Sequence, residues 1–193
     1  MIKAILGGIA ISIGGTAFLS CDNKFIGASL FSIGLLMVCT LNLGLYTGKM
    51  CYSKSVKEVA IIWLGNLIGT CLTAMLINLT RLSGLSAKAA EICNVKLNDS
   101  LLSIFILSMF CNIMIYVGVD NYKNNPHQIG KYMAIYLCVV VFIMAGFEHC
   151  VANMFYFALA DAWSLKTLIY LLVMTLGNAV GGIVFARLRR MYI

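Results

Sequence analysis

Six long apolar runs dominate this sequence, and each is long enough for a helix that crosses a lipid bilayer. Such a helix needs about 20 mostly apolar residues. The runs cover roughly residues 3–20, 25–48, 59–80, 100–119, 131–160 and 165–187. With 62% hydrophobic and 11% charged residues, a chain of 193 residues cannot bury so much apolar surface in a soluble core. The sequence therefore predicts an all-α integral membrane protein with six transmembrane helices, and excludes disorder, fibrous repeats and nucleic-acid binding.

Only short polar stretches separate the runs, so residues 1–193 are predicted to form a single transmembrane domain. These stretches cover residues 21–24, 49–58, 81–99, 120–130 and 161–164. The first run resembles a signal peptide in one respect, since Lys3 precedes it. Its glycine pairs, Gly7-Gly8 and Gly14-Gly15, favour close helix packing instead, and we interpret it as a membrane span.

The basic residues indicate the orientation of the chain. The net charge of +7 comes from residues that lie singly between the apolar runs, as topology signals do. With the N-terminus inside, nine basic residues lie on the inner side and five on the outer side, which predicts that both termini face the cytoplasm. The inner set is Lys3, Lys49, Lys54, Lys57, Lys123, Lys131, Arg187, Arg189 and Arg190, and the outer set is Lys24, Arg81, Lys88, Lys96 and Lys166.

The eight cysteines show no metal-ligand spacing. They stand at positions 21, 39, 51, 71, 93, 111, 138 and 150, and several fall inside apolar runs. We interpret them as small buried hydrophobic residues, with a structural disulfide or a metal role as the alternative. No metal and no cofactor are expected.

Two of the apolar runs are predicted to contain broken helices. The second carries Asn42-Leu43-Gly44-Leu45-Tyr46-Thr47-Gly48 late in its length, and the fifth is too long for one straight crossing. Irregular backbone at membrane depth is tolerated only where protein or a water-filled cavity satisfies it. The strings Gly65-Asn66-Leu67-Ile68-Gly69 and Gly177-Asn178-Ala179-Val180-Gly181 lie in the third and sixth runs. They predict two inverted halves, about 1–85 and 95–193, with a permeation site between them.

Glu148 and His149 are the residues in the runs best suited to chemistry. Glu148 is the one acid deep inside an apolar run, and a carboxylate there should face protein or water. A packed polar pair that joins helices is one interpretation. The neighbouring irregular backbone and Asn153 favour a role in a pore, where histidine can exchange a proton near neutral pH.

These residues resemble a known family. The string Gly146-Phe147-Glu148-His149-Cys150-Val151-Ala152-Asn153-Met154 resembles the fifth-helix signature of the formate/nitrite transporter family. Leu45-Tyr46-Thr47-Gly48 is similar to its second-helix break, Cys111-Asn112 to a pair in its fourth helix, and the two Gly-Asn strings to its third and sixth helices. Lys96, sixteen residues before Asn112, fits the family's outer-loop lysine. The resemblance covers all six runs.

The resemblance implies an aquaporin-like inverted repeat, assembled as a homopentamer in the bacterial inner membrane with one pore per subunit. It implies a channel for formate, nitrite or hydrosulfide, coupled to protons through His149. The implied pore residues are His149, Thr47, Asn112 and Lys96. The implied apolar constrictions are Phe31, Leu35 and Phe142 on one side and Leu45 and Tyr46 on the other. The implied anchors of the broken helices are Glu148, Asn153, Asn66 and Asn178.

Several alternatives stay open from the sequence. An aquaporin-like channel for water or small neutral solutes shares the implied fold, although the only proline, Pro126, excludes an Asn-Pro-Ala motif. An intramembrane enzyme using Cys150 beside His149 is disfavoured, because adjacent helical residues do not easily make a nucleophile–base contact. A purely structural membrane subunit leaves Lys96, Thr47 and His149 unexplained. The Tyr46 hydroxyl either adds polarity to the slit or reaches a backbone carbonyl.

The chain is short for the family that it resembles. Almost nothing precedes Lys3 or follows Arg190. The cytoplasmic N-terminal segment that is linked to pH gating in formate channels is therefore expected to be missing. A pore that is open, or gated only by the loop of the second run, is the resulting expectation.

Overall fold

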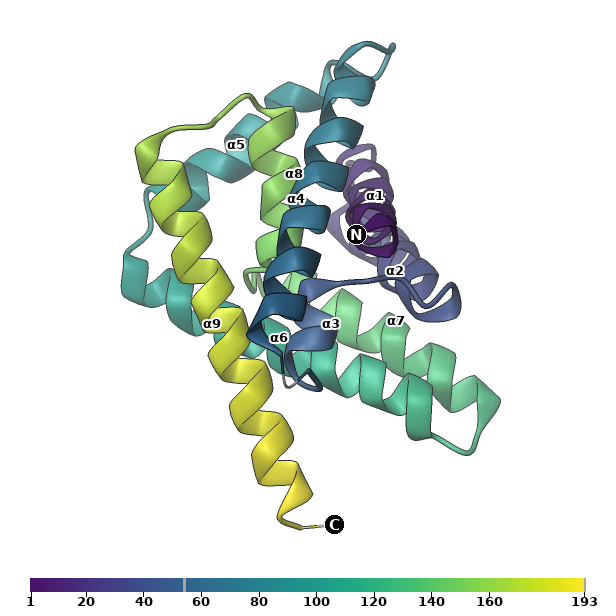
Figure 1. The fold of residues 1–193 in the computed structure, drawn as a ribbon. Coiled ribbons are helices and arrows are strands. Elements are labelled where there is room, and N and C mark those ends of the chain that lie inside the picture. The colour runs from purple at the N-terminus through teal and green to yellow at the C-terminus, as the bar shows by residue number, and fades with distance from the viewer. Residues whose placement is uncertain (54, 193) are drawn as a thin grey trace.

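The computed structural model describes residues 1–53 and 55–192, and over these residues it forms nine α-helices and no strand (Figure 1). Lys54, one of the predicted inner basic residues, lies outside the described residues. The helices are α1 (Ile2–Leu19), α2 (Lys24–Thr40), α3 (Tyr46–Met50), α4 (Val56–Asn78), α5 (Leu85–Leu97), α6 (Leu101–Asn124), α7 (Gln128–Met144), α8 (Cys150–Leu159) and α9 (Leu165–Arg190).

Four helices of the described chain, α1, α4, α6 and α9, are long and apolar enough to cross a membrane, and α2, α7 and α8 are shorter apolar helices. Side-chain caps explain where several of them begin. Asn23 Oδ1 accepts the backbone N–H groups of Phe25 and Ile26 at 2.9 and 3.0 Å, which starts α2. Ser55, Ser100 and Ser164 accept a backbone N–H in the same way at the starts of α4, α6 and α9.

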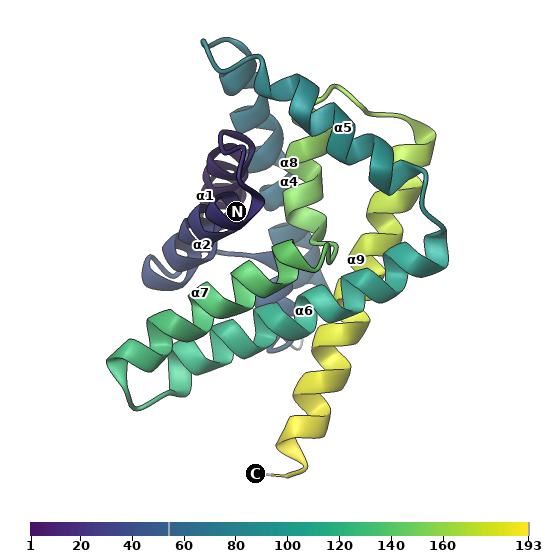
Figure 2. The same cartoon turned by 180° about the vertical axis from the view of Figure 1, so that it is seen from behind.

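Two expectations about the polar stretches were wrong. Residues 81–99 were predicted to be a connecting stretch, yet they contain the 13-residue helix α5, which lies across one end of the molecule (Figure 2). Asp120 was placed in a loop, yet α6 continues to Asn124 and Asp120 is 5% exposed. A carboxylate tolerates this burial because Arg189 of α9 pairs with it.

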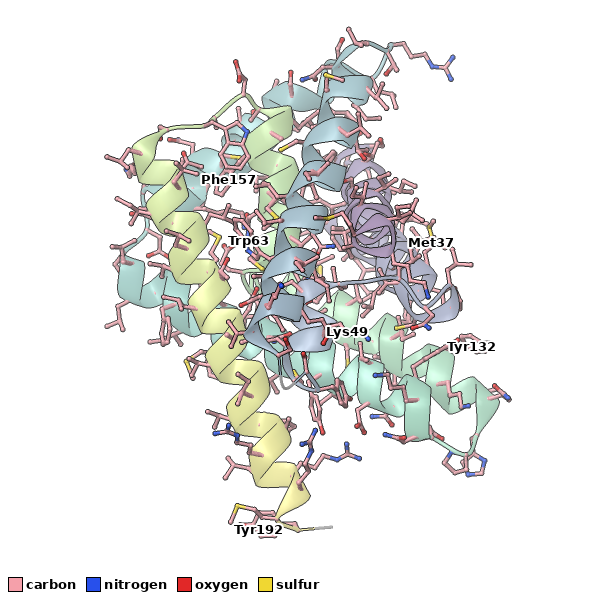
Figure 3. The ribbon with its side chains drawn as sticks, viewed as in Figure 1. Met37, Lys49, Trp63, Tyr132, Phe157 and Tyr192 are labelled. Carbon is pink, nitrogen blue, oxygen red and sulfur yellow. The ribbon has the colours of Figure 1, made fainter. Side chains whose placement is uncertain are left out.

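Close glycine contacts hold α1 against α4 and α6 against α9. A Cβ atom on Gly69 of α4 would fall on the backbone carbonyl of Ile5, and one on Gly181 of α9 on that of Met109. Only glycine permits helices to approach so closely. Trp63 on α4 reaches towards α9, where its indole N–H donates to the Thr175 hydroxyl at 3.1 Å (Figure 3). The short helix α8 lies at the centre of this arrangement and is buried along almost its whole length.

Candidate functional site

The site is built on two short segments at which a helix stops and another begins. One joins α2 to α3 and the other joins α7 to α8, and both have the same local geometry. Asn42 and Gly146 adopt positive φ angles of 51° and 75°. The next N–H in each segment donates back across the helix end, from Leu43 to Val38 and from Phe147 to Phe142, both at 2.9 Å. This is the pattern of a Schellman helix terminus.

Asn66 of α4 and Asn178 of α9 each make three hydrogen bonds, two to one of these segments and one to a neighbouring helix. Asn66 Nδ2 donates to the carbonyls of Ala4 and Gly44 at 2.7 and 2.8 Å, and its Oδ1 accepts the N–H of Tyr46 at 2.9 Å. Asn178 Nδ2 donates to the carbonyls of Ser108 and Glu148 at 2.7 and 2.8 Å, and its Oδ1 accepts the N–H of Cys150 at 2.9 Å. Both side chains are completely buried, so they satisfy backbone groups of the two segments where water cannot.

His149 caps the N-terminus of α8 and contacts Thr47 at the start of α3. Its Nδ1 accepts the N–H of Ala152 at 3.1 Å, and its Nε2 lies 3.0 Å from Thr47 Oγ1. Since Nδ1 is an acceptor, we assign the proton of the neutral ring to Nε2, which then donates to Thr47. A proton on Nδ1 would instead point at the N–H of Ala152. The ring is 2% exposed, and Phe142 stacks on it with ring centroids 5.9 Å apart.

One cavity approaches His149 from the side of α5 and has a volume of about 270 Å³. We call it the Lys96 cavity. It is lined by Phe31, Phe142, His149, Lys96 and Asn153, among other residues. The Phe31 and Phe142 rings meet edge to face, with centroids 6.0 Å apart, so the approach to the histidine is apolar.

A second cavity, of about 200 Å³, lies on the other side of the α2–α3 segment. We call it the Lys123 cavity. It is lined by Leu45, Lys49 and Lys123, and no acid lines it among the described residues. Lys49 is in the last turn of α3, near the start of α4 (Figure 3). Leu45 is 1% exposed and is the N-cap residue of α3, which is the position that His149 occupies before α8.

The charged residue Lys96 is neutralised rather than free. Its ammonium pairs with Glu148 Oε2 at 2.5 Å, and the two side chains are 14% and 5% exposed. Asn153 Nδ2 donates to the same Oε2 at 2.8 Å and to the His149 carbonyl at 3.0 Å. Asn153 Oδ1 is buried without a hydrogen-bond partner among the described residues.

Sequence reasoning missed Lys24 as a residue of this cavity. Lys24 begins α2, lines the Lys96 cavity, and donates from Nζ to the carbonyl of Met144 at 3.2 Å. The described chain gives it no acidic partner, so Lys24 supplies the uncompensated positive charge once Lys96 and Glu148 cancel. Its position directly after the capping residue Asn23 was the signal available, but the cavity is formed by a distant part of the chain.

Three expected pore residues, Asn112, Leu35 and Tyr46, line neither cavity as described, and their roles in a pore stay predictions. Asn112 donates to the backbone carbonyl of Asn178 at 2.6 Å and, within the described chain, makes no hydrogen bond to His149. Leu35 and Tyr46 are buried but line neither of the two cavities as described. The Tyr46 hydroxyl donates to the carbonyl of Thr175 at 3.1 Å. Of the two roles considered for this hydroxyl, adding polarity to the slit or reaching a backbone carbonyl, the structure therefore shows the second.

The apolar helices and the buried polar centre define a multi-pass membrane protein. The sequence pattern of the family described as Formate/nitrite transporter matches residues 1–192. The chain belongs to the formate/nitrite transporter family, as its motifs predicted, and the named members are channels or transporters rather than enzymes.

Relatives and a solved structure agree with this assignment. The chain is 30% identical over 187 residues to the uncharacterized transporter YrhG of Bacillus subtilis, covering 86% of this chain and 70% of the relative. It is 30% identical over 162 residues to the nitrite transporter NirC of Salmonella typhimurium, covering 79% and 60%. A pentameric formate channel with formate bound has a TM-score of 0.88 at 26% identity, covering 99% of this chain and 94% of that chain.

Proposed function

We propose that this chain forms a channel for small monovalent weak-acid anions (formate, nitrite or hydrosulfide), coupled to protons at His149. The observation that carries the proposal is the His149–Thr47 contact, with one cavity reaching His149 and the other lying beyond the segment that leads to Thr47. In this proposal α2–α3 and α7–α8 each form one broken crossing, so the chain crosses the membrane six times. Each subunit of a homopentamer then contains its own pore.

The two halves, about 1–85 and 95–193, are proposed to be inverted copies within a single domain. Equivalent residues of the two helix ends support this, because their residue numbers differ by 104 in each case. The carbonyls of Val38 and Phe142 accept the hydrogen bonds that end α2 and α7, and Asn42 and Gly146 have positive φ angles. The pairing also matches Leu45 with His149. One half therefore places an apolar side chain where the other half places the histidine, which leaves the pore with one proton-exchanging group at its centre.

Desolvation explains why a proton is needed. An isolated anion in an apolar slit loses hydration energy that far exceeds thermal energy, whereas a small neutral acid does not. Lys24 attracts the anion into the Lys96 cavity, and the neutral acid forms where the anion meets His149 and Thr47. With Nε2 donating to Thr47, the Thr47 hydroxyl is free to donate to the passing molecule. The neutral acid then passes Leu45 into the Lys123 cavity.

We propose that the Lys123 cavity faces the cytoplasm and that both termini lie on that side of a bacterial inner membrane. A third cavity groups Met1 and Lys3 with Lys49 and Lys57, and Lys49 also lines the Lys123 cavity. Basic residues gather on the cytoplasmic side of membrane proteins. Asp22, Lys24 and Lys88 share a cavity near the opposite end of α1, which suits the outer side.

The test is anion uptake into liposomes that contain the purified protein, compared among wild type, His149→Asn and His149→Ala. Asparagine is a favourable N-cap, so His149→Asn keeps α8 capped while it removes the imidazole, whereas alanine removes both. We expect both variants to lose the dependence of uptake on the pH gradient. Unchanged flux and pH dependence in both variants would overturn the role of His149. Fast osmotic swelling in water without anion uptake would support the aquaporin-like alternative instead.

A further inference from the structure

A buried carboxylate at the far end of α6 has no part in the proposed transport step. Asp120 is 5% exposed and binds three side chains. Arg189 of α9 forms an ion pair with Oδ2, while the Tyr52 hydroxyl and Asn124 Nδ2 both donate to Oδ1 at 3.1 Å. A buried charge is tolerated only with such compensation, and it then imposes a defined geometry on its partners.

The partner Tyr52 connects this carboxylate to α3. Tyr52 follows α3 by two residues, and the preceding residue, Cys51, accepts a hydrogen bond on its carbonyl from Arg190 at 3.4 Å. The Lys123 ammonium lies 3.9 Å above the Tyr52 ring, in a cation–π contact. Side chains of α6 and α9 therefore hold the end of α3 from two directions.

The helix α3 is too short to keep its position unaided. It has five residues, and isolated helices shorter than about 12 residues are marginal in water. Its first N–H, that of Tyr46, is bound by Asn66. Its far end is bound to α6 and α9 through residues 51 and 52, and Ser53 beyond them donates to Glu58 of α4 at 2.6 Å. The ends of α3 therefore decide where the side chain of Thr47, in its first turn, is placed.

We propose that Asp120, Arg189 and Tyr52 form a tether that positions the Thr47 hydroxyl against His149. The proposal rests on the proposed function, and Tyr52 and Asp120 are positioning residues that act through Thr47. Tyr52 lies five positions after Thr47, which corresponds to about 7.5 Å along a helix. A shift of α3 by 1 Å would lengthen the 3.0 Å contact beyond hydrogen-bonding distance.

The first experiment measures flux in liposomes for Tyr52→Phe, with Asn124→Ala as the matched control. Both variants remove one donor from the same oxygen of Asp120, but only Tyr52 is attached to α3. We expect Tyr52→Phe to lower maximal flux about tenfold, the effect of losing one hydrogen bond to a charged group. Half-saturation should stay unchanged because neither residue lines the Lys96 cavity. Asn124→Ala should retain most of the flux.

A Thr47→Val background shows whether the tether acts through Thr47. If it does, adding Tyr52→Phe to Thr47→Val causes no further loss of flux. Multiplied losses in the double variant, equal losses in Tyr52→Phe and Asn124→Ala, or full flux in Tyr52→Phe would each overturn the proposal.

The second experiment does not depend on transport. Cys51 is 8% exposed, with Sγ 3.8 Å from the Thr47 carbonyl, so its alkylation requires α3 to move. Mass spectrometry of the intact channel after a small maleimide should show about tenfold faster labelling of Cys51 in Tyr52→Phe than in wild type or Asn124→Ala. Equal labelling rates would refute the tether even if wild type carries none of the tested anions. Faster labelling in an inactive channel would instead sustain the tether and reject the proposed function.

Discussion

The clearest single test of how the broken backbone is held is Asn178→Ala. This substitution removes three hydrogen bonds, to the carbonyls of Ser108 and Glu148 and from the N–H of Cys150. The Cys150 N–H stands in the first turn of α8, where a helix provides no internal acceptor. Alanine cannot replace the amide, and the completely buried site offers no bulk water to do so.

The expected loss of stability follows from the groups left unpaired. A buried donor or acceptor without a partner costs about 1–3 kcal/mol, so the Cys150 N–H and Glu148 carbonyl together cost about 2–6 kcal/mol. For a chain of this size, about 1 kcal/mol shifts the thermal midpoint by roughly 2–4 °C. Asn178→Ala should therefore lower the unfolding midpoint by roughly 4–24 °C.

The assay is thermal unfolding of the purified protein in detergent, followed by intrinsic fluorescence. Asn66→Ala should show a similar loss, because Asn66 makes the corresponding three contacts at the other break. Asn121→Ala is the control, since Asn121 makes only two partly buried and local side-chain bonds among the described residues: it donates to the Val117 carbonyl and accepts from Asn125 Nδ2. The reasoning fails if Asn178→Ala and Asn121→Ala unfold at the same temperature.

Two further substitutions test charge and packing. Lys24→Gln should raise the half-saturating anion concentration in liposome uptake about two- to fivefold at low salt, as expected for one exposed charge. Lys88→Gln, which removes the partner of Asp22 instead, should leave the half-saturating concentration unchanged. An equal increase in both variants would contradict a specific role for Lys24. Gly181→Ala should lower stability in detergent by about 1–3 kcal/mol, because its Cβ would fall on the Met109 backbone. Gly84→Ala, with open space around its Cβ, is the neutral control, and a stable Gly181→Ala would refute close packing there.

Local signals made much of the site predictable. The string around His149 and the two Gly-Asn strings identified the family, which the whole-chain match confirmed. Together with Leu45-Tyr46-Thr47-Gly48, they also pointed to His149, Thr47 and the two asparagines, although the roles of these residues in transport stay predictions. Helix α5 was missed because its sequence, Leu85–Leu97, is polar enough to be taken for a connection. Lys24 and the Asp120 tether were missed because each acquires its partners from distant segments.

The sequence by itself determined that this chain enters a membrane and where its helices are irregular. Apolar length imposes the first, since a helix satisfies its own backbone in lipid, and the Asn42–Gly48 string and the excess length of the fifth run signal the second. Only the tertiary structure decided which nitrogen of His149 carries the proton and which charges are paired at the centre of the molecule. Thr47 and Ala152 jointly select the tautomer of His149, and Glu148 cancels the charge of Lys96. Hydrogen bonds and charges act over a few ångströms, so groups 52 and 102 residues apart in the chain meet only after folding.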